Sequence, residues 1–459
     1  MLELDFVLNS LNGRLLSKSD NVEFPGVSTD SRRIRKGELF FALCGSRFDG
    51  HDFIQDAFER GAGGAVVEKP VAFPKLNKFV LIQVPSTLKA LGDLALAWRK
   101  RFPDTKIAAI TGSNGKTTTK EMASSILSLR FSVLKNSGNL NNLIGLPLTL
   151  LKLKSEHRVA VVELGMNDFG EIRRLSEITL PDVGAITCIG KAHLEKLGSV
   201  EGVARAKGEL VESFTDRHTF VVNLDDPWIQ KIASGVRCRK ITFGIESKGV
   251  DISAKDIQPV GLSAIKFRII IEGKEIPLRI RGIGCHNVMN ALCATGIAVS
   301  LGCDTHEVQA GLERFVPAYM RLEVIDTPFG FKVINDAYNA NPDSMRKGIE
   351  ELVRLKGEGR AIAVLGDMLE LGDKSESEHI GLGEFLVDKG VDFVIAYGNY
   401  GTSLLKGTGG RIGGVLATTH EEAAEVLIEY ARPGDLVLIK GSRGVRMENV
   451  IQKLFERYP

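Results

Sequence analysis

The chain has 459 residues, enough for about three domains at about 150 residues each. Its 59 Lys and Arg against 57 Asp and Glu give a net charge of +2. This balance argues against a nucleic-acid scaffold, a polybasic membrane binder and an acidic disordered chain. Glycine is enriched, at 49 residues or about 11 % against an average of about 7 %, which indicates many tight turns and loops whose backbone can line a ligand.

The first part of the chain is typical of a small α/β domain. Strand-like apolar runs occupy 39–43 and 64–67, and a helix is predicted over 51–60. A second helix over 86–101 ends before Pro103, because proline biases the preceding residue away from helix. We therefore predict a first domain over 1–84 and a linker helix within 85–104.

The middle of the chain alternates apolar strands with amphipathic helices, a pattern typical of a mainly parallel sheet. Residues 250–282 break this rhythm by alternating polar and apolar side chains, which predicts an antiparallel insertion, and a helix over 287–301 follows. A central domain over 85–314 is expected. Its predicted strands are 106–111, 159–163, 185–189 and 219–223.

A second α/β pattern starts near residue 320. Asn341 and Pro342 predict a helix start there, with Asn341 as the N-cap and Pro342 at the first helical position. We predict a C-terminal Rossmann-like domain over 315–459, and thus an α/β protein of three domains with a phosphate-loop-type ATPase domain at its centre. The strands predicted for this last domain are 331–335, 361–365, 393–397 and 436–440.

The six cysteines are scattered and form no Cys-x-x-Cys pair, which indicates reduced thiols in a cytoplasmic protein. Residues 1–5 carry acids where a signal peptide needs a basic region. No run of about 18 apolar residues occurs. We expect a cytoplasmic chain with no membrane span and no nucleic-acid partner.

The strongest local motif is the stretch Thr-Gly-Ser-Asn-Gly-Lys-Thr-Thr-Thr at 111–119, directly after an apolar strand. Its glycines let backbone amides approach phosphate oxygens, Lys116 can reach the outer phosphates, and Thr117 can offer a hydroxyl to Mg²⁺. The first glycine of the usual pattern would fall at Ile110, so this is a shortened variant, and a plain turn between strand and helix is the alternative. The residues expected to bind ATP here are Gly112, Ser113, Asn114, Gly115, Lys116, Thr117 and Thr118.

Other polar residues follow predicted strands, where open α/β sheets bind ligands. Glu163 offers a hard oxygen ligand that suits Mg²⁺, although a capping or salt-bridged acid is equally consistent. His193 follows another strand, and for it an ordinary polar contact is the alternative. Four polar residues at or just past strand ends predict a second ligand face on the last domain, namely Asp336, Asp367, Lys440 and Ser442. A nucleotide site on one domain and this face on another predict chemistry in an interdomain cleft.

Several motifs together resemble the Mur ligase family, the ATP-dependent amide-forming enzymes of peptidoglycan assembly. They are 111–119, Asn139-Leu140-Asn141-Asn142, Glu163-Leu164-Gly165-Met166-Asn167, Ala192-His193-Leu194-Glu195, Ala206-Lys207-Gly208-Glu209 and Gly284-Cys285-His286-Asn287 with Asn290. The stretches 28–32, 336–345, 365–372 and 440–443 resemble the members that join D-alanyl-D-alanine to UDP-N-acetylmuramoyl-tripeptide. The resemblance runs from about 28 to 446.

The resemblance implies that Lys116, Glu163, His193 and Lys207 carry the catalysis. Thr117 and Glu163 would bind one Mg²⁺, and His193 would approach a second with Lys207 as a carbamate, because carbamylation turns a repelling cation into an anion. Taken alone, Lys207 would be a solvated residue on a helix over 201–214.

Further ATP contacts are implied for Asn287, Asn290, Arg321 and Asp336. Taken alone, the two asparagines are equally consistent with helix caps, and Arg321 with a surface charge.

The resemblance also implies which residues bind the small-molecule substrates, although each alone resembles an ordinary polar loop. The UDP-linked substrate is expected at Ser28, Thr29, Asp30, Ser31, Arg32, Arg47, Asp49, Gly50, His51, Asn139 and Asn142, and the dipeptide near Asn339, Asn341 and Ser442.

In the implied reaction the tripeptide carboxylate attacks the γ-phosphate of ATP to give an acyl phosphate, and the dipeptide amine then displaces phosphate. The third tripeptide residue is diaminopimelate or lysine, and a bacterial monomer is expected.

Two other functions are weighed against this interpretation. A related ligase, such as a folylpolyglutamate synthase or the diamino-acid-adding ligase, would share the central residues, but 28–32 and 336–345 argue against it. A non-catalytic nucleotide switch would be favoured by loss of Lys116 or Glu163, and both are present. A switch would hydrolyse ATP slowly without acceptors, whereas a ligase needs both of them.

Overall fold

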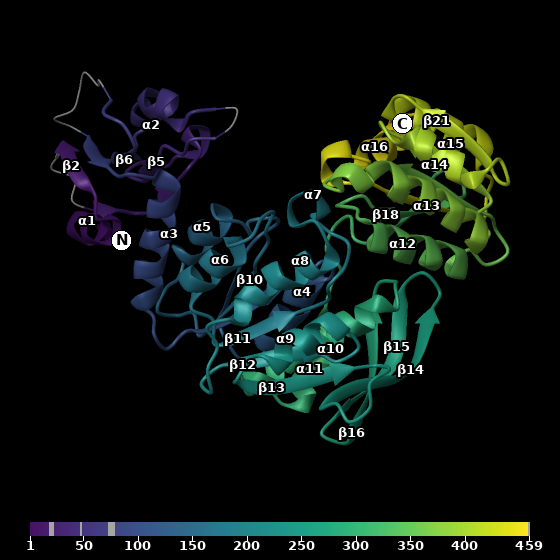
Figure 1. Ribbon diagram of the computed structural model, residues 1–459, viewed down its shortest axis with the longest axis horizontal. Coiled ribbons are helices and arrows are strands. Elements are labelled where there is room, and N and C mark those ends of the chain that lie inside the picture. The colour runs from purple at the N-terminus through teal and green to yellow at the C-terminus, as the bar shows by residue number, and fades with distance from the viewer. Residues whose placement is uncertain (18–22, 46–47, 72–78, 458–459) are drawn as a thin grey trace. The chain divides into compact units, whose positions relative to one another are not determined.

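The computed structural model describes residues 1–17, 23–45, 48–71 and 79–457 (Figure 1). Contacts between Cα atoms divide the chain into two compact units. The first comprises 1–109, 131–166 and 170–182, and the second 110–130, 167–169 and 183–459. The domain limits at 84 and 314 stay predictions.

The first unit contains a five-stranded sheet in the order β2-β7-β6-β5-β4, antiparallel between β2 and β7 and parallel elsewhere. Strand β9 pairs in parallel with β10 in the same unit. The elements are β1 Leu2–Glu3, α1 Leu4–Leu11, β2 Arg14–Ser17, β3 Glu23–Phe24, β4 Val27–Ser28, β5 Leu39–Phe41, α2 Ile54–Glu59, β6 Gly64–Val67, β7 Val80–Gln83, α3 Thr87–Lys100, β9 Val133–Lys135, α5 Gly145–Leu150, β10 Val159–Glu163 and α6 Glu171–Thr179, with 3₁₀ turns at Ser31–Arg33 and Gly50–Phe53.

Alternation along its strands explains why this sheet has a core on each face. Leu39 and Phe41 of β5 pack with residues of α1 and α3, whereas Phe40 packs with Ile54 and Ala57 of α2. Successive side chains of a strand point to opposite faces of the sheet, so one apolar strand contributes side chains to the cores on both faces.

The second unit begins with the last residues of β8 (Lys106–Thr111) and contains the sheet β11 to β16. Strands β11 to β14 are parallel, and β14, β15 and β16 are antiparallel, which confirms the predicted insertion. The elements are α4 Lys116–Leu127, β11 Val183–Ile186, α7 Leu194–Leu197, α8 Val200–Gly208, β12 Thr219–Asn223, α9 Pro227–Ser234, β13 Arg239–Gly244, β14 Ile252–Val260, β15 Ala264–Ile271, β16 Lys274–Arg281, α10 His286–Ser300 and α11 Thr305–Arg314.

A six-stranded sheet, here called with its helices the C-terminal lobe (residues 320–457), completes the second unit in the order β17-β18-β22-β19-β20-β21. Only its edge strand β17 is antiparallel to its neighbour. The elements are β17 Glu323–Asp326, β18 Lys332–Asp336, α12 Pro342–Leu355, β19 Ala361–Gly366, α13 Ser375–Lys389, β20 Phe393–Tyr397, α14 Gly401–Thr408, β21 Gly413–Ala417, α15 His420–Tyr430, β22 Leu436–Lys440 and α16 Glu448–Glu456.

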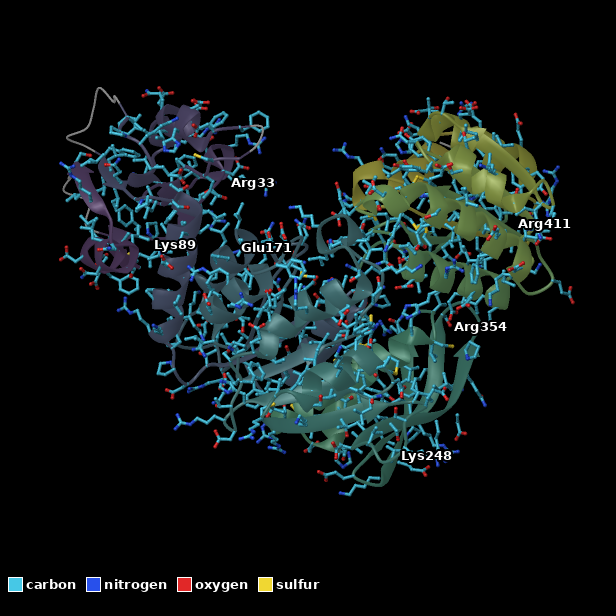
Figure 2. All side chains as sticks on the ribbon, in the orientation of Figure 1. Arg33, Lys89, Glu171, Lys248, Arg354 and Arg411 are labelled. Carbon is cyan, nitrogen blue, oxygen red and sulfur yellow. The ribbon has the colours of Figure 1, made fainter. Side chains whose placement is uncertain are left out.

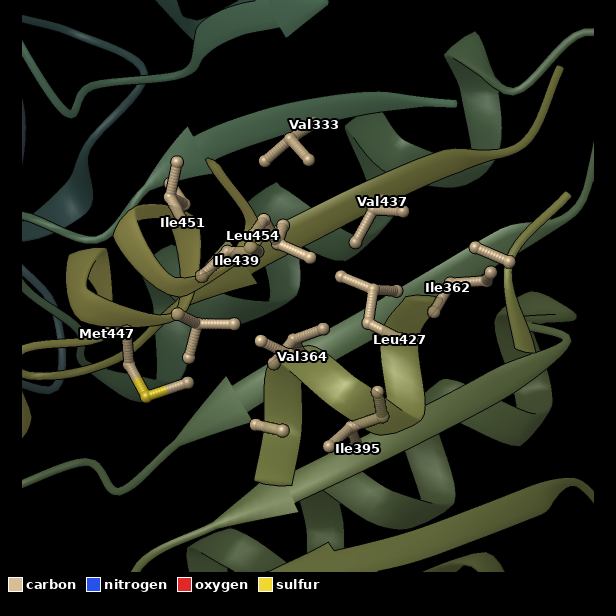
Figure 3. Close-up of a cluster of buried hydrophobic side chains, with 14 of the residues drawn as sticks. Val333, Ile362, Val364, Ile395, Leu427, Val437, Ile439, Met447, Ile451 and Leu454 are labelled. Carbon is tan, nitrogen blue, oxygen red and sulfur yellow. The ribbon is translucent and has the colours of Figure 1, made fainter. Parts of the chain in front are cut away.

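Helices cover both faces of this sheet, as the sequence predicts for a Rossmann-like domain. Val364, Ile395 and Ile439 pack with Leu427 of α15 and Leu454 of α16 in one buried cluster (Figure 3). Helices α12, α13 and α14 contact one another and strands of the same sheet, and Figure 1 shows α12 on the side of β18 opposite α15.

Several predicted elements have different limits in the structure. The strand expected at 185–189 is β11, Val183–Ile186, because Thr187, Cys188 and Ile189 leave the sheet to hydrogen-bond Thr111, Ser113 and Asp226. The helix expected over 201–214 ends at Gly208, where the chain tightens into a 3₁₀ turn at Glu209–Val211, as glycine costs about 1 kcal/mol of helix propensity. The helix expected over 51–60 is a 3₁₀ turn followed by α2, and the strand expected at 331–335 begins one residue later.

An ion pair between the half-buried Arg360 and the buried Asp435 ties together the starts of β19 and β22, away from the carboxyl ends of the strands. Asp435 is 5 % exposed and accepts hydrogen bonds from the Arg360 N–H at 3.0 Å, the Arg360 guanidinium at 2.6 Å and the Arg432 N–H at 2.8 Å. Burial raises the pKa of Asp435, but the Arg360 contacts outweigh it and hold that pKa below its usual range. The pair therefore stabilises the lobe above the unfolded pKa of about 4, and this contribution disappears as pH falls through the lower folded value.

We expect Asp435→Asn to destabilise the C-terminal lobe by about 2–3 kcal/mol at pH 7, because it leaves the Arg360 charge poorly paired. Hydrogen exchange of the β19 and β22 amides measures this loss without unfolding the first unit, and the difference from wild type should shrink below pH 4. Asp392 is the matched control, since it accepts from Ala361 N–H at 2.8 Å and Lys356 at 3.0 Å but is 35 % exposed. An equal loss in Asp392→Asn would contradict the role given to burial.

Candidate functional site

The predicted phosphate loop lies between β8 and α4 in the second unit. Gly112 and Gly115 have φ of +148° and +83°, which non-glycine residues rarely adopt. The loop is held from one side by the segment after β11: the Ser113 N–H donates to Cys188 O at 2.8 Å, and the Thr187 hydroxyl donates to Asn114 O at 2.5 Å. Because β11 ends at Ile186, the residues that follow it are available to support this loop.

Lys116 begins α4 and folds back over the loop. Its ammonium donates to Gly112 O at 2.8 Å. The first N–H groups of a helix and a lysine on the same loop favour an anion at this point. Thr117 is buried and Thr118 half-buried in the first turn of the same helix.

Asn290 lies directly beneath the loop. A Cβ atom added at Gly115 would fall 2.2 Å from Asn290 Oδ1, and the Thr119 hydroxyl donates to the same oxygen at 3.4 Å. Asn290 Nδ2 donates to Asn287 Oδ1 at 2.9 Å, and Asn287 Nδ2 donates to Ile283 O at 2.7 Å. Neither side chain serves as the N-cap of α10, which is Cys285.

We expect Gly115→Ala to weaken nucleotide binding by at least tenfold, because the added methyl collides with Asn290 and the residue keeps a positive φ. Titration with a fluorescent ADP analogue measures the affinity. Gly249→Ala is the control, since Gly249 has φ +72° but no atom within 4 Å of an added Cβ. Unchanged affinity in Gly115→Ala would show that the loop shape does not matter for binding.

Residues of the C-terminal lobe contact this loop. The Arg321 guanidinium donates to the Thr117 hydroxyl at 2.9 Å and lies over the Tyr338 ring. Asn341 Nδ2 donates to Asn114 Oδ1 at 3.0 Å. Arg321 is therefore not the surface charge that it would be as a lone residue.

Residues 190–195, which follow the residues that support the phosphate loop, also contact the C-terminal lobe. The Lys191 N–H donates to Asp343 Oδ2 at 2.7 Å, and the Lys191 ammonium lies 2.5 Å from Glu378. His193, at φ +54°, has its Nδ1 2.6 Å from Glu370 Oε2. The bond from His193 lowers the pKa of Glu370, whose side chain is half-exposed, despite the opposing effect of partial desolvation.

The start of α10 also contacts the C-terminal lobe, through the backbone N–H of Cys285. Glu351 Oε1 accepts from the Cys285 N–H at 3.0 Å, and Arg354, labelled in Figure 2, binds the other oxygen of Glu351 at 3.0 Å. Phosphate loop, segment 190–195 and the start of α10 thus all meet the C-terminal lobe.

Lys207 is buried on α8, at 1 % exposure. The alternative of a solvated helix residue is therefore wrong. Helix α8 contacts α7 and α9, and Lys207 is among its buried residues. Glu209, two residues later, is also buried.

Glu163, in the first unit, ends β10 and is 3 % exposed. Asn141 Nδ2 donates to Glu163 Oε1 at 2.8 Å, and the fully buried Asn136 binds both the N–H and the C=O of Glu163 at 2.9 and 3.1 Å. Sequence analysis missed both asparagines, although Asn141 lies inside the 139–142 motif. Of the residues expected to bind substrate there, Asn139 is exposed, and Asn142 Oδ1 accepts from the Gly145 N–H at 2.9 Å, just before α5 begins.

The residues expected to bind the UDP end form two capped turns. Asp30 Oδ1 accepts from the Arg32 N–H at 3.0 Å, both Asp30 oxygens pair with the Arg32 guanidinium at 2.9 Å, and Ser28 Oγ accepts from the Asp30 N–H at 3.2 Å. The Arg32 side chain is 82 % exposed and lowers the pKa of Asp30. Thr29 and Ser31 belong to the same turn, and Ser31 is buried.

The second turn contains Asp49, Gly50 and His51. His51 Nε2 accepts from the Glu68 N–H at 2.9 Å, so Nδ1 carries the proton that it donates to Asp49 Oδ1 at 2.6 Å. Lys69, at 2.7 Å, together with His51 holds the pKa of Asp49 well below its usual range. Arg47 lies outside the described residues.

The carboxyl edge of the C-terminal lobe gathers the four polar residues expected there, from the neighbouring strands β18, β22 and β19. Lys440 lies 2.5 Å from Asp336 Oδ2 and donates to Asn339 O at 3.0 Å. Ser442 Oγ donates to Ala340 O at 3.2 Å and accepts from the Leu369 N–H at 2.9 Å. Asp367 accepts the N–H groups of Asn399 and Tyr400 at 2.7 and 3.0 Å, which gives it a structural role in this edge.

Among the described residues, no helix combines the length and hydropathy needed to cross a bilayer. The six cysteines lie within the described ranges, and all are free thiols.

A glycine-rich phosphate loop after the buried strand β8, with a lysine and a threonine at the start of the next helix, defines a nucleotide-binding α/β protein. Three family models match it: Mur ligase family, catalytic domain, at residues 23–99; Mur ligase middle domain at 110–298; and Mur ligase, glutamate ligase domain, at 320–443. The chain belongs to the Mur ligase family, and its fold is the three-domain α/β fold of that family.

Relatives named UDP-N-acetylmuramoyl-tripeptide–D-alanyl-D-alanine ligase match nearly the whole chain. That of Bacillus subtilis is 38 % identical over 434 residues, covering 94 % of this chain and 93 % of the relative. That of Escherichia coli is 34 % identical and covers 97 % and 96 %.

Solved structures agree with these relatives. A crystal structure of MurF from Acinetobacter baumannii has a TM-score of 0.90 at 33 % identity, covering 99 % of this chain and 98 % of that one. MurF from Thermotoga maritima, crystallised with ADP, has a TM-score of 0.82 at 28 % identity, covering 94 % and 98 %.

Proposed function

We propose that this chain is an ATP-dependent ligase that joins D-alanyl-D-alanine to UDP-N-acetylmuramoyl-tripeptide through an acyl phosphate, releasing ADP and phosphate. The observation that carries the proposal is the contact of Arg321, from the C-terminal lobe, with Thr117 of the phosphate loop. This contact places a positive charge from the C-terminal lobe, which also carries the second ligand face, beside the nucleotide loop. Transfer of a phosphoryl group from one anion to another needs such a charge to reduce their repulsion. The relatives' name supplies the substrates.

The chain's own residues do most of this work by placing charge. Lys116 exchanges its bond to Gly112 O for the outer phosphates, and Arg321 neutralises charge beside Thr117. Both steps favour approach of the tripeptide carboxylate to the γ-phosphate. Lys440 holds Asp336 and the backbone of Asn339 at the edge of the lobe where the dipeptide and the ATP ribose are proposed to bind.

The donor chemistry of the residues that would hold Mg²⁺ suits this ion. The Thr117 hydroxyl and the Glu163 carboxylate, the latter oriented by Asn141, are hard oxygen donors, and His193 would take part with a carbamylated Lys207. When bound, the ion supplies charge neutralisation at the phosphates.

Residues 28–32, 49–51, 139 and 142 would bind the UDP end, and Asn287 and Asn290 would lie near the adenine. The protein would act in the bacterial cytoplasm as a monomer.

The test is release of ADP and phosphate by purified protein with ATP and Mg²⁺, omitting UDP-muramoyl-tripeptide and D-alanyl-D-alanine in turn. We expect release only when both are present, with a UDP-muramoyl-pentapeptide in the mass spectrum. Slow release that ignores both acceptors would indicate a nucleotide switch instead. No turnover with either the diaminopimelate or the lysine tripeptide would overturn the substrate assignment.

A further inference from the structure

Asn341 occupies a position between the phosphate loop and helix α12. It is 9 % exposed and is the N-cap of α12, where its Oδ1 accepts from the Ser344 N–H at 2.9 Å. The Ser344 hydroxyl is 3.0 Å from the Asn341 N–H, which completes a capping box.

The cap decides how the Asn341 amide is oriented. Because Oδ1 must face the Ser344 N–H, the NH₂ group points the other way, to Asn114 Oδ1 at 3.0 Å. Asn114 Nδ2 returns a longer contact to Asn341 Oδ1 at 3.4 Å. The Asn341 side chain thus caps the start of α12 in the C-terminal lobe and also binds a residue of the phosphate loop.

Asn114 is itself tightly placed. Its carbonyl accepts from the Thr187 hydroxyl at 2.5 Å, and it stands between Gly112 and Gly115, whose conformations shape the loop. A nucleotide that orders residues 112–117 therefore also orders Asn114 Oδ1, the acceptor for Asn341.

We propose that Asn341 is a positioning residue that couples nucleotide binding at the phosphate loop to the placement of the start of α12. Coupling of this kind is reciprocal, so an ordered α12 also favours the loop conformation that binds nucleotide. Resting on the proposed function, bound nucleotide then also favours the placement of the dipeptide edge of the lobe, because Asn341 belongs to that edge.

The two functions of Asn341 can be separated by substitution. Asn341→Ser keeps a good N-cap but is too short to reach Asn114 and adds no charge. Ser344→Ala is the matched control, because it removes the hydroxyl from the same helix end and leaves both the cap N–H and the Asn114 contact. Asn341→Ala removes cap and contact together.

The measurement is hydrogen exchange of residues 342–347 with and without a non-hydrolysable ATP analogue and Mg²⁺, in the full chain. We expect the analogue to slow exchange there about tenfold in wild type and Ser344→Ala, and less than twofold in Asn341→Ser, with equal exchange of the nucleotide-free proteins. Asn341→Ala should exchange faster even without nucleotide. A full response in Asn341→Ser, no response in wild type, or equal loss in Ser344→Ala would each overturn the proposal.

Equilibrium binding gives a second readout. In Asn341→Ser the loss of about one hydrogen bond should weaken dipeptide binding at saturating ATP analogue about fivefold to tenfold, and should weaken binding of the analogue at saturating dipeptide by the same factor, because the coupling is reciprocal. A change in only one of the two affinities would contradict the proposed coupling. Because the exchange experiment uses nucleotide alone, its result stands even if the dipeptide proves to be the wrong substrate.

Discussion

Lys116→Ala should abolish ligase turnover, lowering kcat by about a thousandfold or more. Lys116 is the cation at the first turn of α4, and in the structure it is poised over the loop by its bond to Gly112 O. Its removal leaves the developing charge on the transferred phosphoryl group without its nearest neutralising side chain. The measurement is ADP release in the presence of both acceptors, with bound nucleotide followed separately.

Lys191→Ala is the control for this experiment. Lys191 lies in the neighbouring segment and pairs with Glu378 through its side chain, whereas its contact with Asp343 uses the backbone N–H and survives the substitution. We expect less than a threefold change in kcat, because the ammonium of Lys191 is half-exposed and pairs with Glu378 rather than with the phosphate loop. If Lys116→Ala retained more than a tenth of wild-type activity, the loop would not be the site of phosphoryl transfer.

Lys207→Ala and Lys207→Arg should both lose activity by about a hundredfold to a thousandfold, since neither side chain can carry a carbamate. An arginine in that buried position also brings a permanent positive charge near the proposed metal ligands. Incubation with ¹³C-bicarbonate should give a carbamate resonance in the wild-type protein that is absent from both variants. This spectroscopic result is independent of turnover.

Lys120 provides a matched lysine, because it is also 1 % exposed but sits on α4, 3.1 Å from Glu121. Lys120→Ala should keep the carbamate resonance. If the resonance persisted in Lys207→Ala, or never formed in wild type, the modification would be excluded, and Lys207 would act as a buried cation. Full activity of Lys207→Arg would lead to the same conclusion.

Much of the fold and the centre of the site follow from local sequence. Strands 106–111, 159–163 and 219–223 have the predicted limits because they are short apolar runs bounded by polar residues and turns. The phosphate loop is readable because glycines, lysine and threonine must stand within a few residues of one another. The Asn341-Pro342 helix start is equally local, and the structure confirms it.

The ends of β11 and α8 could not be predicted in this way. Apolar residues continue past Ile186, but the hydrogen bonds of Thr187, Cys188 and Ile189 go to residues far away in the chain. Those bonds replace the sheet ladder, and no local pattern indicates them.

The sequence by itself determined the class of fold, the nucleotide loop and the family, because each depends on residues close together or on motifs in a set order. Only the tertiary structure decided that Lys207 is buried, that Arg321 reaches Thr117, and that Asn341 binds Asn114. The last two contacts join residues 204 and 227 positions apart. A side chain's own neighbours in sequence set its helix or strand, whereas its partner across such a distance is set by how the sheets and helices pack.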